Sequence, residues 1–178
     1  MIPKTLFLTR LVFLLSITLV IELIGLPQPV TGPFINFMLI VTTQIVSATG
    51  GAVLGCVTPA LAVLRGQLPP PLAPMVPFII LANALFVITF AVMRSHQPTT
   101  VLFYYLRNGL AIVAAASIKF IVLYLTARFL LPLLLGKPVS AALVSLMALP
   151  QWLTALIGGW LALVFYRFWL TKIKAAHR

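Results

Sequence analysis

The hydrophobic positions of this 178-residue chain gather in long continuous runs instead of alternating with polar positions. Apolar runs of roughly 15 to 30 residues are typical of transmembrane helices, which need about 20 residues to cross a bilayer core. Strands of a β-barrel would instead alternate apolar and polar positions over about ten residues. We therefore predict six transmembrane helices, at about residues 5–24, 34–48, 52–64, 75–93, 101–131 and 140–170.

The breaks between these runs are rich in glycine and proline. Proline lacks an N–H donor and restricts the residue before it, so helices seldom continue through clusters of prolines. We expect non-helical links at residues 25–33, 49–51, 65–74 and 94–100. Pro132 and Gly136 should end the fifth helix, and Pro150 should interrupt the hydrogen bonds of the sixth. The length leaves room for little else, so we predict a single transmembrane domain over residues 1–178.

Composition supports a membrane location. Hydrophobic residues make up 62% of the chain and charged residues only 7%, whereas soluble domains carry about 25% charged residues. A chain so poor in charge could not cover its own core with hydrated groups. We therefore predict an all-α integral membrane protein, a compact bundle of six transmembrane helices in contact with the lipid bilayer.

The charge is strongly positive, with twelve Lys and Arg residues against one acid, Glu22. In a soluble protein this would suggest nucleic-acid binding. Here the cations lie singly at the ends of apolar runs, where such side chains reach lipid phosphates and set orientation. Arg65 and Lys137, with Arg128 nearby, fall on one side. The other side, which holds both termini, collects most of the cations, and we therefore predict cytoplasmic N and C termini. These cations are Lys4, Arg10, Arg94, Arg107, Arg167, Lys172, Lys174 and Arg178.

Lys119 lies near the middle of the fifth predicted helix. At 100° per residue it shares one stripe with Asn108, Ala115 and Thr126. A charged group at mid-membrane costs at least about 2.5 to 3.5 kcal/mol, so it usually faces protein or a cavity. We expect Lys119 to contact a ligand. The alternative is a structural role, as a buried partner of Glu22 or of backbone carbonyl groups.

The sixth predicted helix places Gln151 on an inward stripe with Ser140 and the small residues Ala155, Gly158 and Ala162. Asn83 has a similar depth in the fourth helix. Either amide could line a ligand site or serve as an interhelical hydrogen bond. We predict a cavity in the outer half of the bundle, bounded by the fourth, fifth and sixth helices and capped by the external links. The candidate substrate-binding residues are Lys119, Gln151, Asn83, Asn108, Glu22, Arg65 and Gln67.

Small residues recur at four-residue spacing in two helices. Gly51 and Gly55 form a GxxxG pattern, and Ala111 and Ala115 form an AxxxA pattern. Such patterns let helix backbones approach closely. They indicate packing inside the bundle, or else a contact with another subunit.

Several chemistries are not expected. The two histidines, His96 and His177, fall outside the predicted helices, and no His/Cys/Asp/Glu cluster fits a metal. One acid excludes paired-carboxylate catalysis, and the single Cys56 excludes an internal disulfide. There is no GxxxxGK[ST] motif for ATP hydrolysis. We therefore predict a binding protein or conduit rather than an enzyme, with no cofactor and no nucleic-acid partner.

Several stretches are shared with one transporter family. They are residues 26–33, 51–59 and 65–69, Asn83, the pair Lys119–Phe120, and Pro150–Gln151 with Gly158–Gly159. Together with the length and the six predicted helices, these stretches resemble the substrate-binding S components of energy-coupling-factor (ECF) transporters, the vitamin uptake systems of prokaryotes. The nickel and cobalt branch of that family needs a histidine at position 2, where this chain has Ile2.

The resemblance implies a multi-pass protein of the prokaryotic cell membrane that binds a vitamin-like molecule near the outer face. It implies partners as well, namely a transmembrane T subunit and two ATPase subunits. The family often carries a small-xxx-small motif on the first helix that meets the T subunit, and here only Ser16 and Val20 offer a counterpart. A different class of function, a non-transporting membrane scaffold or assembly protein of a larger complex, stays open.

Overall fold

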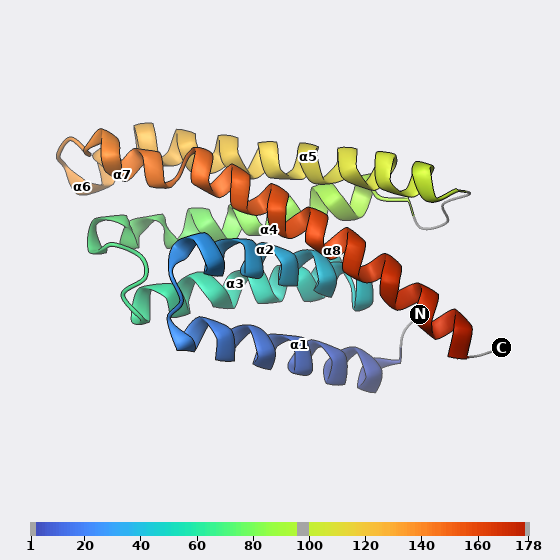
Figure 1. The fold of residues 1–178 in the computed structure, drawn as a ribbon. Coiled ribbons are helices and arrows are strands. Elements are labelled where there is room, and N and C mark those ends of the chain that lie inside the picture. The colour runs from blue at the N-terminus through green and yellow to red at the C-terminus, as the bar shows by residue number, and fades with distance from the viewer. Residues whose placement is uncertain (1–2, 96–99, 177–178) are drawn as a thin grey trace.

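The computed structural model describes residues 3–95 and 100–176, so the predictions at Ile2, His96 and His177 lie outside the described residues. Within them the chain is helical and contains no strand (Figure 1). The long helices are α1 (Lys4–Ile24), α2 (Gln28–Ile45), α3 (Ala48–Leu64), α4 (Val76–Met93), α5 (Val101–Leu125) and α8 (Leu149–Ala176). The short ones are the 3₁₀ segment η1 (Pro70–Met75), the π segment η2 (Thr126–Leu130), α6 (Leu131–Leu135) and α7 (Ala141–Leu146).

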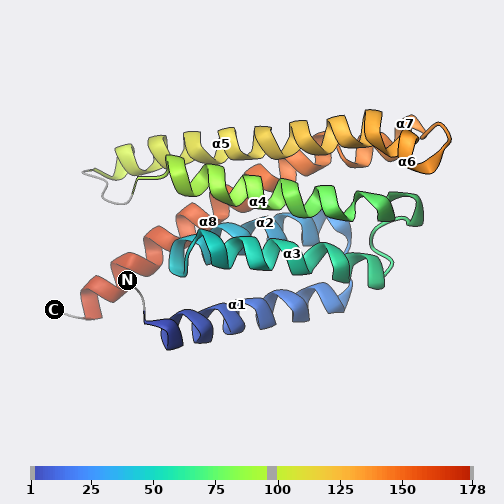
Figure 2. The ribbon, with the colours of Figure 1, turned by 180° about the vertical axis from the view of Figure 1, so that it is seen from behind.

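Successive long helices run in opposite directions, so that α1 begins and α8 ends at the same end of the bundle (Figures 1 and 2). We call this the terminal end. The opposite end, which we call the loop end, carries the links at residues 25–27, 65–69 and 136–140. This arrangement agrees with an even number of passes.

Among the described residues, four helical segments are long and apolar enough to cross a membrane: Lys4–Ile24, Pro70–Met93, Val101–Leu135 and Ala141–Lys172. Large apolar side chains are exposed on their outer faces, including Val12, Leu81, Leu110 and Leu161. Exposed apolar surface of this extent is suited to lipid. Helix α3 is apolar but shorter.

Helix α2 lies in the middle of the bundle, packed against α8, α3, α1 and α4 (Figures 1 and 2). Its buried residues include the polar Asn36, Thr42, Thr43 and Gln44. These side chains make α2 less apolar than α1, α3 and α4, and its central position shields them from the surroundings. The core around it is formed by residues of every long helix, among them Leu39, Leu54, Phe86 and Ile112.

The starts of α2 and α3 differ from the sequence prediction. Helix α2 begins at Gln28 instead of about Phe34, because a proline in the first turn, Pro29, has no N–H that the helix would need. Helix α3 begins at Ala48, because the Ser47 side chain caps it by accepting a hydrogen bond from Gly50 N at 3.0 Å. The expected break at residues 49–51 is therefore the first turn of α3.

The predicted effects of Pro132 and Pro150 are also corrected. After α5 the chain passes through the π segment η2 and continues past Pro132, which lies in the first turn of α6, to end at Gly136, whose φ of 61° is left-handed. In the last predicted helix the break falls between α7 and α8, at residues 147–148. Pro150 therefore lies in the first turn of α8 and interrupts no ladder of hydrogen bonds.

Two close helix crossings depend on glycine. A Cβ at Gly158 of α8 would collide with the backbone of α2 at Pro33 O and, at 2.7 Å, at Phe37 N. A Cβ at Gly55 of α3 would lie 2.9 Å from Asn83 Cβ of α4. Both crossings bring an asparagine, Asn36 of α2 or Asn83 of α4, toward the centre of the bundle.

The AxxxA residues Ala111 and Ala115 are fully buried in the core. The bundle therefore uses Ala111 and Ala115 for its own packing, and the alternative, that they form a contact with another subunit, does not fit their burial. Ser16 and Val20 are exposed on α1.

Candidate functional site

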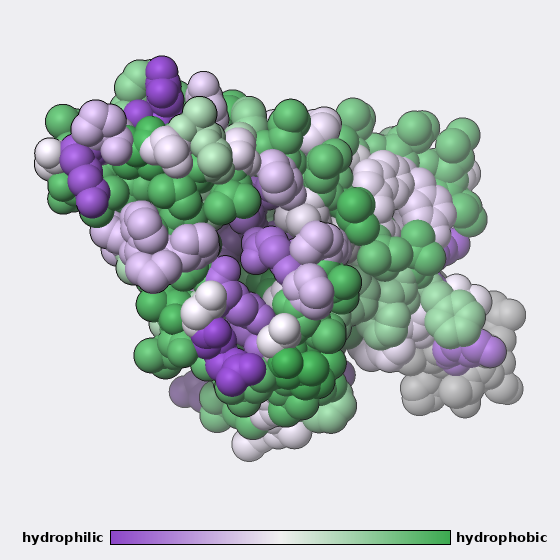
Figure 3. Space-filling model, turned by 60° about the vertical axis from the view of Figure 1, so that its left-hand side comes forward, coloured by the Kyte–Doolittle hydropathy of each residue, from purple (hydrophilic) through white to green (hydrophobic). Residues whose placement is uncertain are grey.

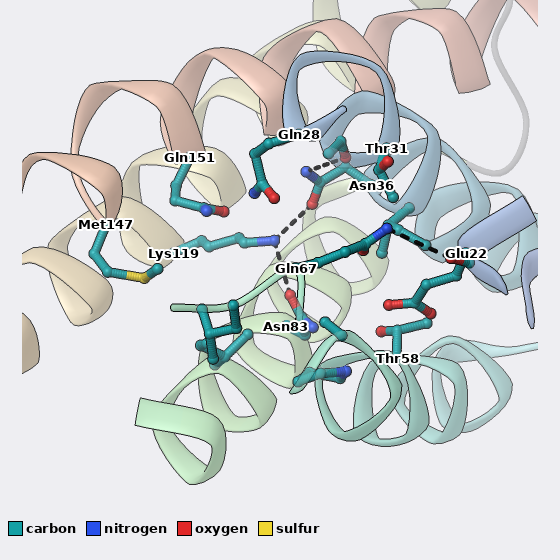
Figure 4. Close-up of a pocket in the computed structure, with 16 residues that line it drawn as sticks. Glu22, Gln28, Thr31, Asn36, Thr58, Gln67, Asn83, Lys119, Met147 and Gln151 are labelled. Atoms are coloured by element: carbon teal, nitrogen blue, oxygen red, sulfur yellow. Dashed lines mark hydrogen bonds between the residues drawn. The ribbon is translucent and has the colours of Figure 1, made fainter. Parts of the chain in front are cut away.

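Lys119 is the centre of a buried polar cluster. Its side chain is only 3% exposed, and Nζ donates to Asn36 Oδ1 at 2.6 Å and to Asn83 Oδ1 at 2.8 Å (Figure 4). The ring of Phe86 lies 5.4 Å from Nζ, within the range of a cation–π contact. A lysine ammonium has three N–H donors, so these two hydrogen bonds leave one donor free.

Asn83 is oriented by a proline in the neighbouring helix. Its Nδ2 donates to Gly55 O of α3 at 3.1 Å. The residue that would normally donate to this carbonyl in a helix is four positions on, and it is Pro59, which has no N–H. Asn83 therefore satisfies a carbonyl that Pro59 leaves free, and this hydrogen bond turns its amide oxygen toward Lys119.

Asn36 is oriented in a similar way by its own helix. Its Nδ2 donates to Gly32 O at 2.9 Å and approaches Thr154 Oγ1 of α8 at 3.4 Å. Both asparagine NH₂ groups are thus used on protein acceptors, and both amide oxygens face Lys119. The cluster holds α2, α4 and α5 together at the depth of Lys119.

The cluster lies on the wall of a cavity of about 90 Å³ that is open toward the loop end. In Figure 3 this end faces forward, and hydrophilic side chains gather in and around a central hollow whose flanks are mainly hydrophobic. Every long helix contributes to the lining, together with the link after α3. The polar residues of the lining are Glu22, Gln28, Thr31, Asn36, Thr58, Gln67, Asn83, Lys119 and Gln151.

Glu22 and Thr58 form the side of the cavity opposite to the Lys119 backbone (Figure 4). Glu22 is 2% exposed, and its Oε2 has no hydrogen-bond partner among the described residues. Thr58 Oγ1 is likewise unpartnered within the described part of the chain. Gln67 reaches over them from the link after α3, where its Nε2 lies 3.5 Å from Glu22 O.

The structure brings together five of the seven candidate residues: Lys119, Gln151, Asn83, Glu22 and Gln67. The other two do not line the cavity. Asn108 shares the inward face of α5, but it lies at the terminal end, where its Oδ1 accepts from Ser95 N at 2.8 Å. Arg65 is exposed just beyond α3. A helical stripe predicts which face points inward, but Asn108 lies eleven residues, or about 16 Å, from Lys119 along α5 and therefore outside the cavity.

Asn36 is the main residue that sequence reasoning missed. It is an amide inside an apolar run, the same signal that identified Asn83. Gln28 and Thr31 were placed in a non-helical link, so their helical positions facing the cavity could not be foreseen. The predicted boundary of helices four, five and six is therefore too narrow, because α1, α2 and α3 also line the cavity.

No family model, no curated protein and no solved structure matches this chain. Its function is therefore inferred from the cavity and from the sequence.

Proposed function

We propose that this chain is the membrane-embedded substrate-binding subunit of an ECF-type importer in a prokaryotic cell membrane. It captures a small vitamin-like molecule at the loop end, which faces outward. It delivers the molecule inward together with a transmembrane T subunit and two ATPase subunits. The chain itself performs no chemical step.

The observation that carries this proposal is the polar cavity around Lys119. Buried polar groups are costly in a membrane and are usually retained for a function or for helix contacts. A cluster that served only to join helices would need no accessible space. Here two of the three N–H donors of Lys119 are used by the described residues, and Glu22 Oε2, in the same wall, has no partner among them.

The size of the cavity restricts the substrate. At about 90 Å³ it is well below the roughly 300–1,000 Å³ of pockets for drug-sized ligands. A cavity of this size suits a small molecule. A larger vitamin requires the link at residues 65–69 and the adjoining η1 segment to move away from the loop end.

Two features support these partners, namely the sequence's lack of a nucleotide-binding motif and the exposed face of α1. Its sequence contains no nucleotide-binding motif, so energised uptake requires ATPases supplied by other subunits. The exposed face of α1, with Ser16 and with Val20 at 56% exposure, is open to a T subunit.

Reconstitution in liposomes tests this proposal. The chain alone should bind substrate but not accumulate it, whereas addition of a T subunit and ATPases should give ATP-dependent uptake. Accumulation by the chain alone would contradict the proposal. So would stable purification with a large complex that contains no ATPase, which is the result expected of a membrane scaffold.

A further inference from the structure

We propose that the ligand carries two opposed groups, an amine-type or amidine-type N–H donor for Glu22 and a carboxylate or carbonyl acceptor for Lys119. This inference rests on the proposed function, since it assumes that the cavity receives a ligand. It assigns Glu22, with Thr58, as the subsite for the donor end of that ligand.

Glu22 has an unusual position for a structural residue. It is the only acidic residue in the 178-residue chain, and it lies in the cavity wall at 2% exposure, where Oε2 has no partner in the described part of the chain. A buried carboxyl group without a donor is costly. An ammonium, amidinium or amide N–H group of a ligand would supply the missing donor.

Thr58 strengthens this assignment. Its Oγ1 is also unpartnered within the described residues, and Figure 4 places it beside the Glu22 carboxyl. A hydroxyl can accept one hydrogen bond while donating another. Two polar groups from different helices, α1 and α3, thus line the same cavity without a partner among the described residues.

Lys119 presents the complementary requirement. Its two hydrogen-bond partners, Asn36 and Asn83, are neutral amides, so its positive charge has no anion among them. The remaining N–H donor lies on the cavity wall. A carboxylate or carbonyl group would take this donor, and the carboxylate would form the stronger, charge-assisted bond.

The two charged residues together favour a ligand that is neutral overall but has separated charges or dipoles. A purely anionic ligand would leave Glu22 without a donor and place a second negative group nearby. A purely cationic ligand would leave the Lys119 ammonium without an acceptor and place a second positive group near it. Gln28, Gln67 and Gln151 line the same cavity and can both donate and accept, so they suit the uncharged middle of such a molecule.

A matched ligand series tests this inference on the full chain in detergent. The probes are unbranched ω-amino acids from glycine to aminohexanoate, each with the alkylamine and the carboxylate of the same length. One ω-amino acid should raise Tm at saturating concentration, as a ligand of the folded state does. Its matched amine and carboxylate should do so less.

Variants assign the ends of the ligand. Glu22→Gln, which keeps the shape of the side chain, should weaken binding of the ω-amino acid about tenfold or more, the ratio for one charge-assisted hydrogen bond. Thr58→Val is a second variant at the same subsite and should weaken binding in the same direction. Gln44→Met serves as control, because Gln44 is a buried amide near the end of α2, away from the cavity.

Two outcomes overturn the inference. One is that no ω-amino acid stabilises the wild type more than its matched amine and carboxylate. The other is that Glu22→Gln and Thr58→Val bind the best probe as tightly as Gln44→Met does. Either result leaves the importer function standing if the wild type still retains a small molecule that Lys119→Met loses. If neither the ligand tests nor this retention experiment gives the expected result, the importer function is contradicted as well.

Discussion

At the residue scale, the position of Asn83 follows from the chemistry of a proline one helix away. Pro59 removes the donor that Gly55 O would otherwise accept, and Asn83 Nδ2 replaces it. The same amide gives its oxygen to Lys119. One side chain thus satisfies a helix carbonyl and holds the cluster, which explains an asparagine in an otherwise apolar helix.

This dependence predicts a coupling between the two residues. Asn83→Ala should destabilise the fold by about 1–2 kcal/mol, because it leaves Gly55 O without a donor. In a Pro59→Ala background the backbone N–H of residue 59 can donate to Gly55 O, so the cost of Asn83→Ala should fall by at least about 0.5 kcal/mol. Melting or denaturant curves of the four proteins measure the coupling. Strictly additive effects would show that Asn83 does not replace the missing donor.

At the element scale, the crossing of α2 and α8 positions the cluster. Gly158 lets α8 approach the backbone of α2, and Gly32 lies on the same contact, where an added Cβ would be 2.9 Å from Thr154 Cγ2. Asn36 lies on this face of α2 and contacts Thr154. Separation of the two helices would therefore move Asn36 relative to Lys119.

Gly158→Ala tests this crossing. The added methyl group would meet Pro33 O, Phe37 N and Asn36 Cβ, and two of these are backbone atoms that cannot rotate away. We expect a loss of about 1–3 kcal/mol, the usual cost of overpacking, with weaker ligand binding. Ile157→Ala is the matched control, because Ile157 is exposed on the adjacent position. Equal Tm values for the two variants would contradict the close packing.

Sequence patterns predicted some elements well and others poorly, for physical reasons. The stripe on α5 correctly identified Asn108, Ala115 and Lys119 as buried, because helical periodicity fixes a face. The starts of α2 and α3 were misplaced, since proline and glycine also fit the first turn of a helix. The partners of Lys119 depend on how helices cross, which periodicity does not encode.

At the scale of the whole molecule, the cavity lies at the end of the bundle opposite to the start of α1 and the end of α8. Cations concentrate near the terminal end, with Arg10 of α1 donating to Ile45 O of α2 and Arg107 of α5 donating to Met93 O of α4. By the positive-inside tendency, the proposed orientation places the terminal end in the cytoplasm. In this proposed orientation the cavity faces the outside.

Cysteine labelling in intact cells checks this orientation. Replacement of the only cysteine, Cys56, by serine gives a background without thiols. In that background an impermeant reagent should label Lys137→Cys at the loop end and should label Lys172→Cys only after permeabilisation. Both positions are exposed in the structure. The reverse pattern would place the cavity on the cytoplasmic side and contradict uptake from outside.

The central claim is that the cavity around Lys119 holds a small molecule. Mass spectrometry of the small molecules retained by the purified chain measures this directly, in the wild type, Lys119→Met and Lys137→Met. The wild type and the exposed-lysine control should retain the same molecule, and Lys119→Met should lose it while staying folded, with affinity lower by about 1.5–3 kcal/mol. Retention of no molecule by the wild type, or equal retention by all three proteins, would show that Lys119 is a structural link between helices.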